Sequence, residues 1–162
     1  MSRTTRSVKC TLGCCTLDIG DYISSNLITR PRRNKKAGGL IYDKDEMSVL
    51  LIQSHGNLWG APKGTLEDNE STKDGAIREI FEETGLKINT TELGDSITID
   101  DTSTYFLIER KKCKVSIQMN VNGNDVNAIG WVKLDCMKQF IEDKIIKLTK
   151  HTELIIEHFL ET

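Results

Sequence analysis

The sequence predicts an α/β domain, in which helices pack against a β-sheet, and three observations lead to this class. Residues 37–43 (AGGLIYD) and 48–54 (SVLLIQS) have the composition of strands, and the polar residues between them predict a turn. Residues 135–143 and 152–160 have the apolar spacing of helices. The length of 162 residues suits one domain with a sizeable core.

Further strands are predicted on both sides of this framework. The continuous apolar run VLLI within 48–54 is typical of a strand that is buried on both faces. Residues 104–109 and 114–120 alternate in polarity, and we expect them to pair as a hairpin. A short strand at 97–99 and another at 128–134 are expected to complete the sheet.

Residues 64–86 (GTLEDNESTKDGAIREIFEETGL) carry an unusual concentration of acidic side chains. At about 100° per residue, Glu79, Glu82 and Glu83 lie on one face of a helix. Like charges at that spacing destabilise a helix by about 0.2–0.5 kcal/mol per pair, and a multivalent cation would reverse this effect. Because Mg²⁺ and Mn²⁺ prefer oxygen ligands, this face predicts a metal site. Arg78 adjoins Glu79 and is placed to hold one carboxylate by a bidentate contact.

The ends of this helix are also marked in the sequence. Ser71 or Thr72 is the expected N-cap, and Gly85 fits the left-handed residue that ends many helices. The side opposite the glutamates is apolar, and we expect it to pack on the core; it is formed by Ala76, Ile77, Ile80 and Phe81.

The same stretch resembles a known family. The pattern G-x5-E-x7-R-E-U-x-E-E-x-G-U, in which U is aliphatic, is the signature of the Nudix hydrolases. This chain matches it without departure, at Gly64, Glu70, Arg78, Glu79, Ile80, Glu82, Glu83, Gly85 and Leu86. The resemblance implies the Nudix fold, an α/β/α sandwich with a mixed β-sheet and a loop–helix–loop catalytic motif. We expect this domain at residues 37–162, preceded by an N-terminal extension at 1–36.

The resemblance also implies a chemistry. Nudix enzymes hydrolyse a nucleoside diphosphate linked to another moiety, with the help of Mg²⁺ or Mn²⁺. The implied metal ligands are Gly64, Glu79, Glu82 and Glu83. Glu70 is implied as a further ligand or as a support for Arg78, and Glu82 or Glu83 is the first choice for activating water.

Two residues outside the signature are further candidates. The segment 59–64 (WGAPKG) is similar to one in the mRNA-decapping and the asymmetric dinucleoside polyphosphate hydrolases of the family, and it places Lys63 where an ammonium can meet a phosphate, unless it is a solvated turn lysine. Trp59 is expected to plug the core rather than to stack on a base. In both subfamilies a glutamate six residues before an aromatic completes the site. Asp125 holds that place before Trp131 here, and it is either a catalytic acid or a turn former.

A basic run precedes the first confident strand. Five of the seven residues at 30–36 are cationic: Arg30, Arg32, Arg33, Lys35 and Lys36. The run is either a solvated linker or a phosphate-facing patch beside the active site. The rest of the segment 1–36 is expected to be a flexible or docking extension, and the alternation within residues 8–19 allows a strand there.

Composition narrows the class of partner. With 22 basic and 24 acidic residues the net charge is −2, which favours neither DNA nor a membrane as a partner. No apolar run approaches the ~18 residues of a membrane span. The odd number of cysteines predicts free thiols and a cytoplasmic location rather than a secreted disulfide framework. Cys10, Cys14 and Cys15 lack a matching pair at zinc spacing.

Three functions remain open from the sequence. The first is hydrolysis of an RNA 5′ cap, with RNA contacts through residues 30–36. The second is hydrolysis of a free substrate, either a dinucleoside polyphosphate or an inositol pyrophosphate. The third is a nucleotide-binding module without turnover, which the intact Glu79, Glu82 and Glu83 argue against.

Overall fold

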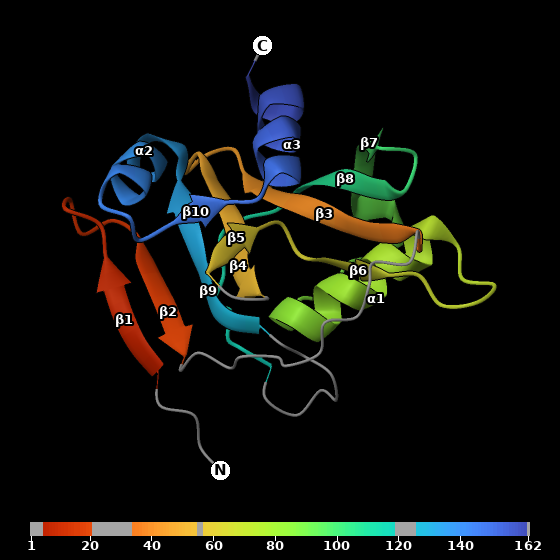
Figure 1. Cartoon of the computed structure of the whole chain (residues 1–162), viewed down its shortest axis with the longest axis horizontal. Coiled ribbons are helices and arrows are strands. Elements are labelled where there is room, and N and C mark those ends of the chain that lie inside the picture. Colours follow the sequence, from red (N-terminus) through yellow and green to blue (C-terminus); the bar gives the residue numbers. More distant parts are fainter. Residues whose placement is uncertain (1–4, 21–33, 55–56, 119–125, 162) are drawn as a thin grey trace.

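A mixed β-sheet with helices on both faces forms the molecule (Figure 1). The computed structural model describes residues 5–20, 34–54, 57–118 and 126–161. Its strands are β1 (Thr5–Lys9), β2 (Thr16–Gly20), β3 (Lys36–Asp43), β4 (Ser48–Ser54), β5 (Leu58–Gly60), β6 (Lys63–Thr65), β7 (Leu93–Ile99), β8 (Ser103–Glu109), β9 (Val126–Lys133) and β10 (Lys147–Leu148). Its helices are α1 (Thr72–Thr84), α2 (Leu134–Glu142) and α3 (Lys150–Leu160), with a 3₁₀ turn at Thr90–Glu92.

The main path of the sheet runs β1-β2-β9-β4-β3-β8-β7. Strands β3 and β8 pair in parallel, and the other neighbours on this path pair antiparallel. Three short strands attach at one side: β6 pairs with β3, β5 pairs with β4, and β10 pairs in parallel with β5. This arrangement brings β3, β5 and β6 together beside α1, where the candidate site lies.

The sheet is buried on both faces, as the apolar run in β4 predicts. Val49 and Leu51 pack in the core layer that includes residues of α2 and α3, whereas Leu50 and Ile52 pack in the layer that includes α1. All four side chains are buried. Because successive side chains of a strand point to opposite faces, a strand between two helical layers needs apolar residues throughout. The predicted α/β/α sandwich is confirmed.

Residues 5–20 of the expected N-terminal extension pair with the sheet, while the domain boundary expected between residues 36 and 37 remains a prediction. Strands β1 and β2 form an antiparallel hairpin, and β2 pairs with β9 over Leu17 to Ile19. Leu17 and Cys15 are fully buried in the core layer of α2 and α3. The alternation within residues 8–19 indicates a strand, and the structure divides this stretch between the end of β1, a turn and β2.

The predicted hairpin between 104–109 and 114–120 is wrong. Strand β8 instead pairs with β3 and β7, and residues 110–118 form no strand; residues 119 and 120 lie outside the described part. The Arg110 amide still donates to the Tyr42 carbonyl of β3 at 2.9 Å, and the segment beyond it is held by contacts with side chains. The Lys112 amide donates to the Asp43 carboxylate at 2.6 Å, and the Trp131 indole donates to the Cys113 carbonyl at 2.8 Å.

Helix α1 begins and ends where the sequence predicts. The Ser71 hydroxyl accepts a hydrogen bond from the Asp74 amide at 3.1 Å, and Gly85 ends the helix with a φ of 79°. Ile80 is fully buried against the sheet, but Phe81 is 42% exposed, so its expected place in the core is wrong. The buried stripe follows the i, i+4 spacing, and Phe81 lies about 100° away from it around the helix.

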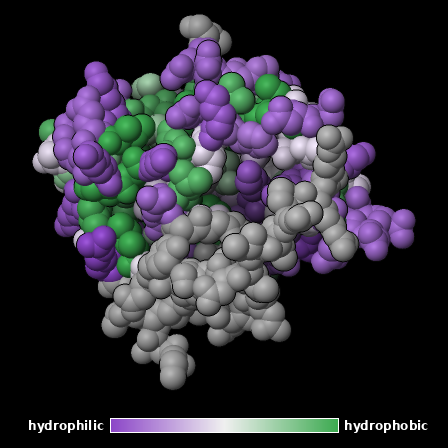
Figure 2. Space-filling view, viewed as in Figure 1, coloured by the Kyte–Doolittle hydropathy of each residue, from purple (hydrophilic) through white to green (hydrophobic). Residues whose placement is uncertain are grey.

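The two late helices confirm the predictions for 135–143 and 152–160 to within two residues. None of the described helices has the length and apolar content needed to cross a membrane. On the face shown in Figure 2, hydrophobic side chains gather at the left, over the part that holds β1, β2 and α2. Hydrophilic side chains project at the right, where the loop between β6 and α1 lies.

Candidate active site

A cavity of about 310 Å³ lies between α1 and the short strands. Its polar lining includes Lys36 from β3, Lys63 and Gly64 from β6, Thr149 before α3, and Glu79, Glu82 and Glu83 from α1. Trp59, between these strands and the core, is fully buried, as expected for a core plug. The cavity therefore joins one acidic wall and two lysines.

The acidic wall is one face of α1. Glu79, Glu82 and Glu83 all line the cavity, as their i, i+3, i+4 spacing predicts. The side chain of Glu79 is only 12% exposed, whereas that of Glu82 is 35% exposed. Burial raises the pKa of Glu79, and the neighbouring Arg78 opposes this effect.

Arg78 joins the helix to the preceding loop. Its Nε and Nη2 donate to the two oxygens of Glu70, at 2.8 and 2.9 Å. Its Nη1 donates to Glu79 at 2.9 Å and to Glu82 at 3.2 Å, and Nη2 also donates to the Thr65 carbonyl at 3.0 Å. The hydrogen bond from Arg78 lowers the pKa of Glu70, and the bond to Glu70 raises that of Arg78. One guanidinium thus orients three carboxylates.

Strand β6 supplies the opposite wall of the cavity. A Cβ atom at Gly64 would overlap the carboxylate of Glu79, so only glycine allows this close approach. The Lys63 amide donates to Glu83 Oε2 at 2.9 Å. Burial lowers the pKa of the Lys63 ammonium, and the charge of Lys36 lowers it further. Two lysines are therefore held near carboxylates in a partly desolvated cavity.

The sequence did not indicate a second polar cluster near Lys63, which is formed by Tyr105, His151 and Asp100. Tyr105 Oη and His151 Nδ1 are 2.9 Å apart, and His151 Nε2 is 3.4 Å from Asp100 Oδ2. The Lys63 ammonium lies 5.9 Å from the centre of the Tyr105 ring. Burial lowers the pKa of His151, and Lys63 adds to this effect. These residues come from separate elements, so no local spacing could have indicated them.

The basic run and Asp125 supply the remaining predicted site residues. Lys36 lines the cavity, whereas Lys35 is exposed and is not among its lining residues. Arg32, Arg33 and Asp125 lie outside the described residues.

The side chains of this cavity fit a divalent cation. The donors on α1 are carboxylate oxygens, which hard cations such as Mg²⁺ and Mn²⁺ prefer. The absence of a side chain at Gly64 also leaves its backbone close to Glu79. Arg78 fixes Glu79 and Glu82 through one nitrogen, which keeps both carboxylates on the same side of the helix.

Comparison with known proteins identifies the family to which the chain belongs. The model of the NUDIX domain family matches residues 32–151. A putative hydrolase, 111R, of Invertebrate iridescent virus 3 is 29% identical over 136 residues, which is 80% of this chain and 79% of that protein. The 8-oxo-dGTP diphosphatase of Proteus vulgaris is 33% identical over 85 residues, 47% of this chain and 76% of that protein.

Two further matches are partial. The m7GpppN-mRNA hydrolase dcap-2 of Caenorhabditis elegans is 45% identical over 52 residues, which is 30% of this chain and only 7% of that protein. A bifunctional NMN adenylyltransferase/ADP-ribose pyrophosphatase from Francisella tularensis, solved with AMP and a manganese ion, has a similar fold. It has a TM-score of 0.60 and 20% identity, and the match covers 83% of this chain and 43% of that one. The family match spans most of the chain and includes the whole signature, so the chain belongs to the Nudix family and is a pyrophosphohydrolase of nucleoside diphosphate-linked substrates.

Proposed function

We propose that this chain hydrolyses the diphosphate linkage of an RNA 5′ cap with the help of Mg²⁺ or Mn²⁺. The observation that carries the hydrolytic part is the meeting of three glutamates and two lysines at one cavity. Carboxylates there favour a cation, and ammonium groups favour a phosphate, so the two walls together suit a metal-bound diphosphate.

The proposed metal ligands are Glu79, Glu82, Glu83 and Gly64, with Glu70 in support through Arg78. A bound divalent ion would neutralise the diphosphate and lower the pKa of a coordinated water. Glu82 or Glu83 takes the proton from the attacking water. Lys63 and Lys36 bind phosphate oxygens, and Arg78 keeps the glutamates in place. A manganese ion in the distant Francisella tularensis structure is consistent with this metal.

The RNA part of the proposal rests on the basic run at 30–36. Lys36, its last residue, lines the cavity, and the other four cationic residues of the run precede it in the sequence. The partial match to a decapping enzyme supports the same substrate. Asp125 is proposed as an additional catalytic acid. We also propose a cytoplasmic location, where the free cysteines stay reduced.

The most direct test is a substrate panel. Purified protein with Mg²⁺ or Mn²⁺ would be given capped RNA, free cap dinucleotide, dinucleoside polyphosphates, 8-oxo-dGTP and inositol pyrophosphates. We expect the highest kcat/KM on capped RNA, with release of the cap nucleotide as a nucleoside diphosphate. A higher kcat/KM on any free substrate would reject the RNA proposal and leave the hydrolytic one intact.

A charge variant tests the RNA path. Charge reversal of Arg32, Arg33 and Lys35 to Glu is expected to weaken the binding of capped RNA far more than the binding of free cap dinucleotide. Each lost phosphate contact should reduce the slope of log K against log salt by ~0.7. Lys138→Glu is the matched control, because Lys138 is 86% exposed on α2, on the other face of the sheet from α1. Equal losses on both substrates would contradict the proposal.

A free nucleotide is the second candidate substrate. The match to the 8-oxo-dGTP diphosphatase covers more of this chain than the match to the decapping enzyme does, and it favours this alternative. In that case the kcat/KM should be independent of RNA length. Turnover of a small nucleotide would also be unaffected by the charge reversal at 32, 33 and 35.

A further inference from the structure

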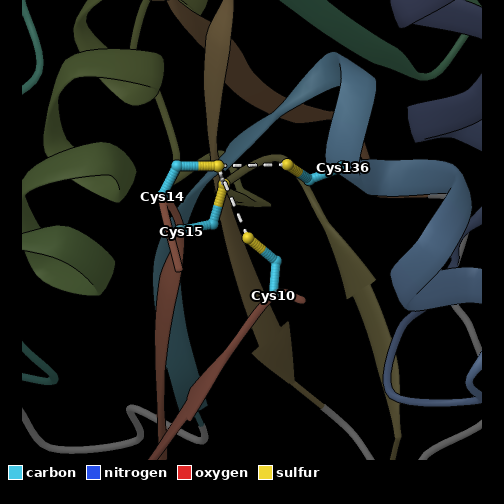
Figure 3. Close-up of side chains that lie close together, drawn as sticks. All are labelled: Cys10, Cys14, Cys15 and Cys136. Carbon is cyan, nitrogen blue, oxygen red and sulfur yellow. Dashed lines mark hydrogen bonds between the residues drawn. The ribbon is translucent and has the colours of Figure 1, made fainter. Parts of the chain in front are cut away.

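Four cysteines from distant parts of the chain meet on the face of the sheet opposite α1 (Figure 3). Cys10, Cys14 and Cys15 lie in the turn between β1 and β2, and Cys136 lies in the first turn of α2. Their Sγ atoms all lie within 4.8 Å of one another. Figure 3 shows the four side chains pointing toward a common centre. Nothing in the proposed reaction uses this group.

The spacing of the sulfur atoms fits one tetrahedral ion. Cys14 Sγ lies 3.4 Å from that of Cys10, 3.9 Å from that of Cys15 and 3.3 Å from that of Cys136. Zinc–thiolate bonds of ~2.3 Å in a tetrahedron separate the sulfur atoms by ~3.8 Å. The observed distances straddle that value, so a single ion requires only small side-chain shifts.

Backbone groups lie close to two of the sulfur atoms. The Lys133 amide donates to Cys15 Sγ at 3.2 Å, and Cys136 is the third residue of α2, where the helix N-terminus stabilises negative charge.

Burial indicates a closed, structural site rather than a reactive one. Cys10, Cys15 and Cys136 are buried, and only Cys14 is half-buried. Four protein sulfurs fill a tetrahedral ion, which leaves no position for a substrate. A cluster of several irons would hold its thiolates farther apart than these sulfur atoms lie, and a single disulfide would leave two buried thiols unused.

We propose that Cys10, Cys14, Cys15 and Cys136 bind one structural Zn²⁺, which fastens the N-terminal hairpin to the start of α2. Outside the ligands, the hairpin is joined to the rest of the described fold by a three-residue pairing of β2 with β9 and by the packing of Leu17 in the core. A zinc bond between residues 14 and 136 closes a loop of more than a hundred residues, so it stabilises the fold against unfolding of the hairpin.

Zinc content of the whole protein tests the proposal. Protein purified without chelators should contain one zinc per chain by native mass spectrometry and elemental analysis. Cys14→Ser and Cys136→Ser should each lose it, whereas Cys113→Ser should retain it, because Cys113 is exposed and lies outside the group. Glu82→Gln should also keep its zinc, since the acidic cavity is a separate site.

Cobalt gives a readout that does not depend on how the variants fold. Addition of Co²⁺ to reduced, metal-free wild-type protein should produce the charge-transfer and visible bands of a tetrahedral thiolate complex. Zinc should displace cobalt with loss of these bands and raise the melting temperature. Absence of the thiolate bands, stoichiometric iron instead of zinc, zinc that is lost in Glu82→Gln but kept in Cys14→Ser, or a disulfide within the group in freshly purified protein would each overturn the proposal.

Discussion

At the scale of single residues, Arg78 connects most of the acidic groups of the site. It contacts Glu70, Glu79 and Glu82 with its three guanidinium nitrogens and also bonds the Thr65 carbonyl. A lysine could not reproduce this geometry, because it offers one charged nitrogen in place of a planar fork. The arginine of the signature is thus explained by the number of partners it serves.

Glu82 and Glu83, which line the cavity, provide the first prediction. Glu82→Gln or Glu83→Gln should reduce kcat by ~10²–10⁴-fold, because each removes a charge from the proposed metal site and a candidate proton acceptor. Steady-state kinetics with Mg²⁺ measures the loss, and urea unfolding should show a fold of nearly unchanged stability. Glu142→Gln on α2 is the control. Wild-type rates in both variants would contradict the metal assignment.

Gly64 provides the second prediction. Gly64→Ala should lower activity strongly and raise the Mg²⁺ concentration needed for half-maximal rate, because the new Cβ would displace the Glu79 carboxylate. Titration of the rate with Mg²⁺ measures this effect. Lys73→Ala, at an exposed residue of α1 that does not line the cavity, should behave as wild type. An unchanged metal titration for Gly64→Ala would show that Glu79 is not a ligand.

At the scale of elements, α1 could be predicted almost completely and several strands could not. The cap at Ser71, the left-handed Gly85 and the glutamate face all depend on neighbours within a few residues, so the sequence contains them directly. The place of Phe81 depends on the exact rotation of the helix over the sheet, which no local pattern specifies.

The strand partners show the opposite case. One partner of β8 is β3, more than sixty residues earlier, and their parallel pairing leaves no turn signal in the sequence. Polarity alternation in 114–120 therefore suggested a hairpin that does not form. Cys136 likewise joins the other three cysteines only through the packing of α2, so its role was not visible from spacing.

The contact between the loop and α1 predicts a pH dependence. Hydrogen bonds from Arg78 lower the pKa of Glu70 in the folded protein. A lowered pKa contributes stability above the ordinary pKa of glutamate, and that stability is lost as pH falls through the lowered value. Glu70→Gln should therefore be less stable than wild type at neutral pH, and the difference should disappear in acid.

Urea unfolding of wild type and Glu70→Gln at several pH values measures this difference. Glu67→Gln is the matched control, because Glu67 is on the same loop, its side chain is 69% exposed and its distance to the Arg78 Nε is 3.9 Å. A difference between wild type and Glu70→Gln that stays constant down to acid pH would contradict the linkage.

At the scale of the whole molecule, the buried contacts of the N-terminal hairpin predict that it unfolds together with the domain. Leu17→Ala should lower the free energy of unfolding by about 2–5 kcal/mol, because Leu17 is fully buried between β2 and the core. Leu12→Ala, in the turn of the same hairpin and 82% exposed, should change it little. Equal values for both variants in urea unfolding would show that the hairpin is independent of the domain.

Residues from distant parts of the chain line the cavity. Glutamates of α1 form one side, whereas Thr149, between β10 and α3, contributes to the other. Substitutions at Thr149 would therefore change the cavity wall without changing the glutamates of α1. Related proteins could therefore differ in their phosphorylated substrates through substitutions in the C-terminal portion alone.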